Sequence, residues 1–261
     1  AEQPAANPHL RRVELREREL TRRARTPGGV EPLMGLLGLW DHVPPTRLTR
    51  IIERARKRRS HPLVRGYATL LAARVAARRG RPELAAQLRR RAGVLSRWWA
   101  CGPFVADEPL AEVFPPQREL LSGAARGASY ATRAGTVAWR QVGWAVAEDA
   151  VPVGSLSSAP GPAAIYLHGW IDSPRAQRAA LRLGVGGPFA VFVDGARVHE
   201  HRVRRAARAD QETVGLRLRA GITALTIKVV VSGAGALLAR LTAPDGGELP
   251  GVRLVARPPG G

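Results

Sequence analysis

The sequence lacks several features that would place it in a common class. Cys101 is the one cysteine, so no disulfide can form within the chain. No run of about 20 apolar residues occurs, which excludes a membrane-spanning helix. Phosphate-loop and dinucleotide fingerprints are missing as well. The glycines at 184, 186 and 187 stand between two predicted strands, so no helix N-terminus is there to hold a phosphate.

Lysine and acidic residues are scarce beside arginine. The 261 residues carry 41 Lys and Arg against 21 Asp and Glu, a formal net charge of +20, and Lys57 and Lys228 are the only lysines. This bias favours a GC-rich genome in addition to selection for charge. Two interpretations stay open: a solvated arginine-rich surface, or a surface that meets polyanions such as nucleic acid, anionic lipid or acidic glycan.

Helical patterns separated by Pro and Gly fill the N-terminal third. We predict helices over about 8–25, 44–59, 62–79 and 82–95, several of them beginning at proline. The short, strongly apolar segment over 31–40 is expected to be buried. In the first helix, Leu10, Val13 and Leu20 are expected to face inward. In the helix over 44–59, the apolar stripe comprises Leu48, Ile51, Ile52 and Ala55.

The pair of helices over 62–95 has small residues where two helices must approach closely, at Ala72, Ala73, Ala76, Ala85 and Ala92, with Gly80 at the turn. In these positions it resembles a tetratricopeptide-type hairpin. The match covers about 35 residues and is partial. Thr69 replaces the usual aromatic residue, and Arg89 stands where a large apolar residue is expected.

Beyond residue 97 the helical period gives way to short alternating runs that predict strands. These run over 98–104, 136–141, 164–171, 237–241 and 252–256, with an antiparallel meander over 177–231 that has one solvated face. Asp194-Gly195 predicts a two-residue hairpin turn in which Val193 faces Ala196 and Val191 faces Val198. Many short strands between regular turns indicate a β-sandwich.

The order of the turn and core motifs carries a more specific resemblance. The motifs are Trp98 with Gly102–Phe104, Phe114–Pro116, Gly135 with Val137 and Trp139, Tyr166–Ile171, Leu181–Gly184 with Phe189–Val198, Leu218–Gly221 with Leu225–Val229, and Pro244–Gly246. Together they resemble the galactose-binding-like jelly roll of glycosidase accessory modules. They are also similar to the region that precedes a transglutaminase-like domain in large bacterial envelope proteins, where helical repeats come first. The resemblance implies an α+β chain with a helical, partly tetratricopeptide-like domain over 1–97 and a jelly-roll β-sandwich over 98–261.

Three groups of residues are candidates for chemistry. His199 and His201 share one strand face and could ligate a metal with His168 or Asp194, but we expect exposed strand histidines and no metal. Cys101 is expected to be a small buried hydrophobe and not a nucleophile. Trp144, Trp170 and Tyr166 are the speculative ligand-binding residues, because aromatic rings can stack on a sugar; Trp139 is expected in the core.

The helix from Arg47 to Arg59 offers a second kind of site. Arg47, Arg50, Arg54 and Arg58 could neutralise phosphates or another polyanion without sequence readout. The alternatives are a solvated helix face and a surface that docks an acidic protein.

We therefore interpret the chain as a non-catalytic interaction module of a bacterial envelope protein, with no catalytic residue and no cofactor. Its helices would dock a protein partner, and its sandwich would act as a scaffold, holding either glycan or the adjoining domain of a larger chain. The alternatives are sequence-independent polyanion binding and a carbohydrate-binding accessory domain of a hydrolase. The start AEQPAANP reads as a mature or trimmed N-terminus. If it is mature, it favours the envelope or periplasm, with the cytoplasm as the alternative.

Overall fold

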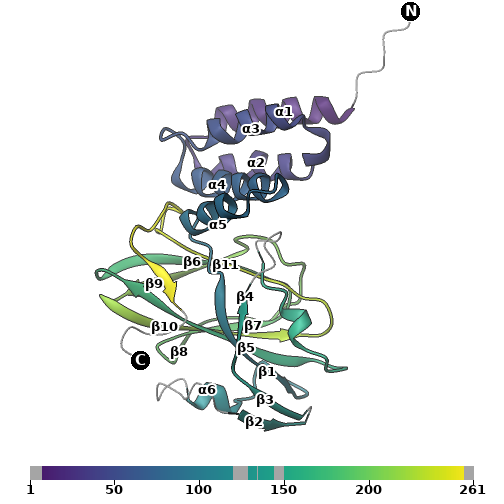
Figure 1. Cartoon of the computed structure of the whole chain (residues 1–261), viewed down its shortest axis with the longest axis vertical. Helices are drawn as coiled ribbons and strands as arrows, with labels where there is room; N and C mark the ends of the chain where they lie inside the picture. The colour runs from purple at the N-terminus through teal and green to yellow at the C-terminus, as the bar shows by residue number, and fades with distance from the viewer. Residues whose placement is uncertain (1–7, 120–128, 134, 144–149, 256–261) are drawn as a thin grey trace, which may run out of the picture. The chain divides into compact units, whose positions relative to one another are not determined.

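The computed structural model describes residues 8–119, 129–133, 135–143 and 150–255. The chain forms two compact units (Figure 1). The helical unit comprises Ala1–Gly93 together with the loop Thr242–Glu248, and the β unit comprises Val94–Leu241 and Leu249–Gly261. N-terminal helices followed by an antiparallel β-sandwich confirm the predicted α+β class.

Five α-helices make up the described part of the helical unit: α1 (Pro8–Arg23), α2 (Val30–Leu37), α3 (Pro45–Ala55), α4 (Pro62–Arg78) and α5 (Pro82–Arg91). Short 3-10 turns, η1 (Pro27–Gly29) and η2 (Trp40–His42), precede and follow α2. Proline opens α3, α4 and α5, where its fixed φ suits a first turn and its missing N–H leaves no donor unsatisfied. Helix α5 ends at Arg91, so the predicted extension of this helix to residue 95 is wrong.

The predicted apolar stripe of α3 is confirmed, since Leu48, Ile51, Ile52 and Ala55 are all buried. In α1, Val13 and Leu20 are buried, but Leu10 is 37% exposed. The prediction that Leu10 faces inward is wrong, because the buried line of this helix follows the seven-residue spacing of Val13 and Leu20.

The hairpin of α4 and α5 buries all five of the predicted small residues, Ala72, Ala73, Ala76, Ala85 and Ala92. Gly80 stands at its turn with φ +68°, a conformation that favours glycine. Arg89 is also buried, at 6% exposure, in the position where the repeat pattern called for an apolar side chain. The hairpin fits the expected geometry, while its membership of the repeat family stays a prediction.

Two antiparallel sheets form the sandwich. The large sheet has the order β4-β1-β5-β10-β7-β8, with β12 paired to β5; the small sheet has the order β11-β6-β9. The strands of the large sheet are β1 (Arg97–Val105), β4 (Arg140–Gly143), β5 (Ala163–Ser173), β7 (Phe189–Val193), β8 (Ala196–His201), β10 (Gly221–Val231) and β12 (Arg253–Val255). Those of the small sheet are β6 (Gln177–Val185), β9 (Glu212–Leu218) and β11 (Leu237–Thr242).

A separate hairpin of β2 (Ser129–Thr132) and β3 (Gly135–Ala138), the short helix α6 (Pro115–Glu119) and the 3-10 turn η3 (Val153–Leu156) complete the described β unit. The single strand predicted over 136–141 is wrong. It is two strands, β3 and β4, which pair in different sheets on either side of Trp139.

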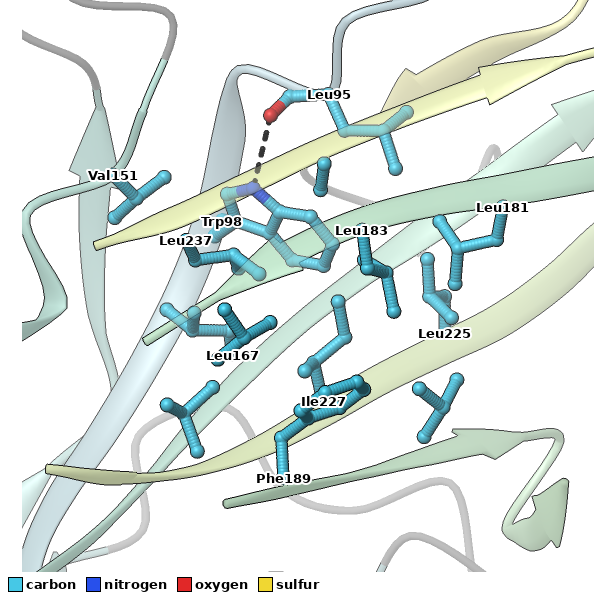
Figure 2. Close-up of a cluster of buried hydrophobic side chains, with 14 of the residues drawn as sticks. Leu95, Trp98, Val151, Leu167, Leu181, Leu183, Phe189, Leu225, Ile227 and Leu237 are labelled. Atoms are coloured by element: carbon cyan, nitrogen blue, oxygen red, sulfur yellow. Dashed lines mark hydrogen bonds between the residues drawn. The ribbon is translucent and has the colours of Figure 1, made fainter. Parts of the chain in front are cut away.

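The core of the β unit lies between the inner faces of the two sheets. Figure 2 shows Trp98, Leu167 and Ile227 of the large sheet with Leu181, Leu183 and Leu237 of the small one. Trp98 is 1% exposed, and its indole N–H donates to the carbonyl of Leu95 at 3.0 Å. The ring therefore fills the core without leaving its polar atom unsatisfied.

The predicted meander over 177–231 is wrong in its pairing. β6 pairs with β9 and β11, whereas β7 pairs with β8 and β10. The chain crosses from one sheet to the other after β6, where a Cβ on Gly187 would lie 2.0 Å from the carbonyl oxygen of Val230. The shared core buries the inner face of each sheet. In β6, β7 and much of β10 the outer face is buried as well, while of the five strands β9 shows a regular buried and exposed alternation.

The hairpin turn at Asp194-Gly195 is confirmed, with φ values of +47° and +82°. Val193 faces Ala196 as predicted. The pairing of Val191 with Val198 is wrong, because a bulge between Val191 and Phe192 shifts the register. His199 now opposes Val191, and Val198 is 45% exposed.

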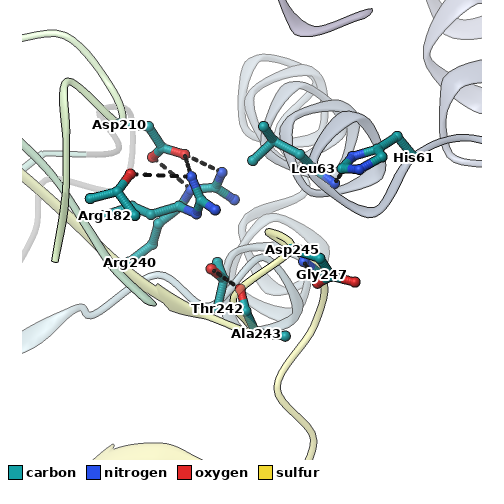
Figure 3. Close-up of polar contacts among 10 residues, drawn as sticks. His61, Leu63, Arg182, Asp210, Arg240, Thr242, Ala243, Asp245 and Gly247 are labelled. Atoms are coloured by element: carbon teal, nitrogen blue, oxygen red, sulfur yellow. Dashed lines mark hydrogen bonds and ion pairs between the residues drawn. The ribbon is translucent and has the colours of Figure 1, made fainter. Parts of the chain in front are cut away.

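An ion-pair cluster lies on the outer face of the small sheet (Figure 3). Nε of Arg240 donates to Oδ1 of Asp210 at 2.8 Å, and Nη1 of Arg182 lies 3.8 Å from Oδ2 of the same carboxylate. All three side chains are less than 10% exposed. Two buried guanidinium groups therefore share one buried carboxylate, and part of the arginine excess serves structure.

Candidate functional site

The outer face of the large sheet carries a row of polar and aromatic side chains. On β5, Leu167 and Ile171 point into the core, so His168 and Trp170 point to the opposite face. The strand register places one residue from each of five neighbouring strands in the row of His168: Gln141, Trp99, His168, Thr226 and Phe192. Sheet pairing thus collects residues that are far apart in the sequence.

His168 is the centre of this row. Its Nδ1 lies 2.7 Å from Oγ1 of Thr226. The ring of Trp170 stands at 89° to the imidazole, with centroids 4.5 Å apart, and the ring of Trp139 lies at 6.0 Å. Edge-to-face packing of this kind holds the rings in place.

We call Trp99, Trp139, His168 and Trp170 the aromatic face. All four side chains are partly exposed, and Gln141 beside Trp99 is exposed. The group therefore combines apolar ring area with an amide and an imidazole, groups that can donate and accept hydrogen bonds. Such a surface suits a ligand that has both an apolar side and hydroxyl groups.

Two residues away from the row of His168 along the strands, the outer face of the large sheet is covered by other parts of the chain. A second cluster of buried residues packs there: Cys101, Phe104, Ala106, Phe114, Tyr130, Ala164 and Tyr166. Residues 106–119 and the β2-β3 hairpin supply Phe114 and Tyr130. The indole N–H of Trp139 donates to the hydroxyl of Tyr130 at 3.4 Å, so Trp139 marks the border between the covered and the open part.

Lys228 holds the covering segment in place. The side chain is 1% exposed, and its Nζ donates to the carbonyls of Leu110, at 2.9 Å, and Glu112. The ammonium also lies 5.1 Å from the centroid of the Phe114 ring. Burial lowers the pKa of Lys228 to about 8.

The three speculative ligand-binding residues have different positions. Trp170 belongs to the aromatic face. Tyr166 is completely buried, donates its hydroxyl to Oε1 of Gln117 at 3.0 Å and packs edge-on against Phe104, so its ring is not open to a ligand. Trp144 lies outside the described residues.

Sequence reasoning assigned no stacking role to Trp99 and considered His168 only as a metal ligand. The signal that could have found His168 is its position two residues before Trp170, on the same face of a strand. For Trp99 the sequence contains no comparable sign, because its place beside His168 depends on how β1 pairs with β5.

Cys101 is 1% exposed, and burial raises the pKa of its thiol to about 12. The thiol therefore stays protonated at neutral pH and packs as the small hydrophobe that the sequence predicted.

The histidine pair does not meet His168. His199 and His201 oppose Val191 and Phe189, whose side chains belong to the core, and both rings lie within 5.7 Å of the Phe189 ring. They are partly buried beside Glu212, at 3.6 and 3.4 Å, so the expectation of exposed histidines is wrong. Within the described ranges, no group of three or more His, Cys, Asp or Glu side chains is placed to hold a metal ion.

Asp194 is also engaged in structure. Its Oδ1 accepts the backbone N–H of Ala224 at 2.8 Å and lies 3.4 Å from Nη2 of Arg219. This carboxylate fixes the hairpin tip against β10.

Two of the four predicted polyanion-binding arginines are engaged within the helical unit. Arg47 and Arg54 pair with the carboxylate of Glu17 at 3.0 and 3.4 Å. Arg50 and Arg58 are exposed. Among the helices that the structure describes, none has the length and apolar character needed to cross a bilayer.

No protein-family model and no curated protein sequence matches this chain. Similar solved structures include the PA14 sugar-binding domain from an RTX adhesin, with 14% identity over 61% of this chain and 96% of that chain and a TM-score of 0.35. The PA14 domain of the MpAFP antifreeze protein is similar over 32% of this chain and 45% of that chain, with 14% identity and a TM-score of 0.28. A β-glucosidase from Kluyveromyces marxianus is similar over 40% of this chain and 14% of that chain, with 14% identity and a TM-score of 0.32. The chain thus spans less than half the length of the latter two. With TM-scores this low, the likenesses carry no functional argument.

Proposed function

We propose that this chain is a non-catalytic module that binds glycan through the aromatic face of its sandwich. The observation that carries the proposal is the arrangement of Trp139 and Trp170 around His168, with all three side chains partly exposed. A sugar ring has an apolar C–H side that stacks on indole and hydroxyl groups that need hydrogen-bond partners. The imidazole of His168 and the amide of Gln141 are suitable partners.

A binding role agrees better with this surface than a hydrolytic one. Glycoside hydrolysis needs two carboxyl groups on either side of the scissile bond. Asp172, the next residue of β5 on the same face, is engaged by Arg253 at 3.0 Å. Cys101 is buried and protonated, so it is not available as a nucleophile. In this proposal, any catalytic partner lies in another domain, as in an accessory domain of a hydrolase.

The test is a titration followed by tryptophan fluorescence, with a neutral polysaccharide, an acidic polysaccharide and peptidoglycan at low and high salt. Stacking and neutral hydrogen bonds are weakly screened, so one glycan should stay bound at about 0.5 M salt. Trp170→Ala should weaken this binding by about tenfold or more, as expected for an aromatic hot spot. Trp40→Phe, in the helical unit, is the matched control and should leave the affinity unchanged.

Loss of all binding at high salt, or equal affinity for Trp170→Ala and the parent chain, would remove the glycan proposal. Polyanion binding through the arginines is the second candidate. The exposed side chains of Arg50 and Arg58 favour it, and it predicts binding to duplex DNA that falls steeply with salt.

A glycan-binding module acts where glycans are exposed, so the proposal includes the bacterial envelope as its location. Mass spectrometry of the N-terminus of the native protein checks this part. A form that starts with Met in the cytoplasm would contradict it.

A further inference from the structure

A pocket of about 380 Å³ lies between α1 and α3 in the helical unit. Leu20, Ile51 and Ala55 line it, and each is less than 5% exposed, so the inner wall of the pocket is aliphatic. Ala24 extends this wall, while Glu17, Thr21 and Ser60 add polar side chains to the lining. The backbone N–H of His61 donates to the carbonyl of Ala24 at 2.7 Å. The site is thus built on two helices and a fixed loop.

Arginines surround this aliphatic wall. Arg22, Arg25 and Arg59 are exposed and line the pocket, and they form no ion pair with any residue in the described ranges. Arg54 also lines it but shares Glu17 with Arg47. The pocket therefore has positive charge that the described residues of the helical unit do not neutralise.

A second basic depression of the helical unit differs in the pairing of its arginines. It is lined by Arg56, Arg65 and Arg91, among others. Arg56 pairs with Glu53 at 2.9 Å, Arg91 with Glu248 at 3.8 Å, and Arg65 donates to two backbone carbonyls. Those three arginines have partners within the fold, whereas Arg22, Arg25 and Arg59 at the α1-α3 pocket form no ion pair with the described residues.

We infer that the α1-α3 pocket binds an acidic peptide segment of a partner protein, which inserts one leucine-like side chain. The aliphatic wall takes the side chain, and carboxylates on either side of it pair with Arg22, Arg25 and Arg59, since guanidinium groups bind carboxylates with two parallel hydrogen bonds. A nucleic acid has no aliphatic group to fill the wall, and a lipid surface does not enter a concave pocket. This inference is independent of the glycan proposal.

The experiment titrates the full chain with a fluorescein-labelled, end-blocked nonapeptide made of Asp and Glu with one central Leu. The same peptide with a central Gly measures the contribution of the pocket wall, and octanoate and duplex DNA are competitors. The Leu peptide should bind about fivefold or more tightly than the Gly peptide, in line with burial of one aliphatic side chain. The double variant Arg25→Glu/Arg59→Glu should weaken the Leu peptide by about tenfold or more.

The double variant Arg11→Glu/Arg12→Glu is the matched control, because it makes the same change in net charge at exposed positions of α1 that do not line the pocket. It should change the affinity by less than about twofold at moderate salt. Circular dichroism checks that both double variants are folded. Equal affinity for the two peptides would overturn the inference, and so would a loss of affinity in the control as large as in the pocket variant. Displacement of the Leu peptide by octanoate or DNA, at a concentration no higher than that of the peptide, would overturn it as well.

Discussion

Trp98 and Trp99 are neighbours in the sequence, yet they have opposite environments. Trp98 is 1% exposed, and its N–H is satisfied inside the core. Trp99 lies on the other side of the same strand, partly exposed and next to His168 in the register. Ile171 and Trp170 repeat this contrast on β5. Alternation along the strand therefore places neighbouring side chains on opposite faces of the sheet, whatever their residue type.

The outer face itself has two parts. Tyr166 and Lys228 oppose each other in one row and are buried under residues 106–119, while His168 and Thr226 form the next row. His168 remains partly exposed. A segment remote in sequence therefore decides which part of a sheet face is open.

The largest expected effect is on the free energy of unfolding, for a substitution on the core-facing side of β1. Trp98→Ala should lower the free energy of unfolding by about 3–5 kcal/mol, because it leaves a cavity in the core and the carbonyl of Leu95 without its donor. Urea unfolding followed by circular dichroism measures it. A loss below about 1 kcal/mol would contradict the central place of this ring in the core.

Trp170→Ala should have the opposite profile. Its side chain is partly exposed, so the free energy of unfolding should change by no more than about 1 kcal/mol. The affinity for glycan should fall. Urea unfolding beside the binding titration separates the two effects. If Trp170→Ala destabilises the chain as much as Trp98→Ala does, the division into a core face and a binding face is wrong.

The strand over 164–171 and the turn at Asp194-Gly195 were predicted correctly from the sequence, because both depend on local residue patterns. The sequence did not predict which part of the sheet face is covered. The sheet to which β6 and β7 belong, and the bulge that exposes Val198, depend on pairing between distant segments. Burial of Tyr166 depends on Phe114 and Gln117, some 50 residues earlier, so the sequence alone could not separate it from Trp170.

Lys228 predicts a pH dependence that reports on the covered part. Its pKa is lowered from 10.5 to about 8 in the folded protein. As pH rises through 8, the folded chain releases this proton while the unfolded chain keeps it, so stability rises. The pKa of the buried Cys101 is raised from 9.0 to about 12, so its thiol ionises first in the unfolded chain and opposes the effect from about pH 8 upward. Lys228 alone should contribute a gain of about 1 kcal/mol between pH 8 and 9.

Urea unfolding of the parent chain and of Lys228→Met at several pH values between 7.5 and 9 measures this gain. The variant should show no rise. An equal slope in both proteins would mean that Lys228 is not the group responsible.

The smallest effect concerns the register of the β7-β8 hairpin. Val198→Thr should change the unfolding free energy by less than about 0.5 kcal/mol, because the side chain is 45% exposed. Val191→Thr, at a completely buried position, should cost about 1–3 kcal/mol. If the two variants lost equal amounts of unfolding free energy, the result would support the originally predicted pairing of Val191 with Val198, without the bulge.

The most direct test of the central claim uses the indole N–H signals of the six tryptophans. Heteronuclear NMR spectra of the ¹⁵N-labelled chain are recorded while the glycan retained at high salt is added, with signals assigned by single Trp→Phe variants. The account predicts that the signals of Trp99, Trp139 and Trp170 shift together with one affinity, while those of Trp98 and Trp40 stay in place. Shifts confined to Trp40, or no shift at Trp170, would contradict it.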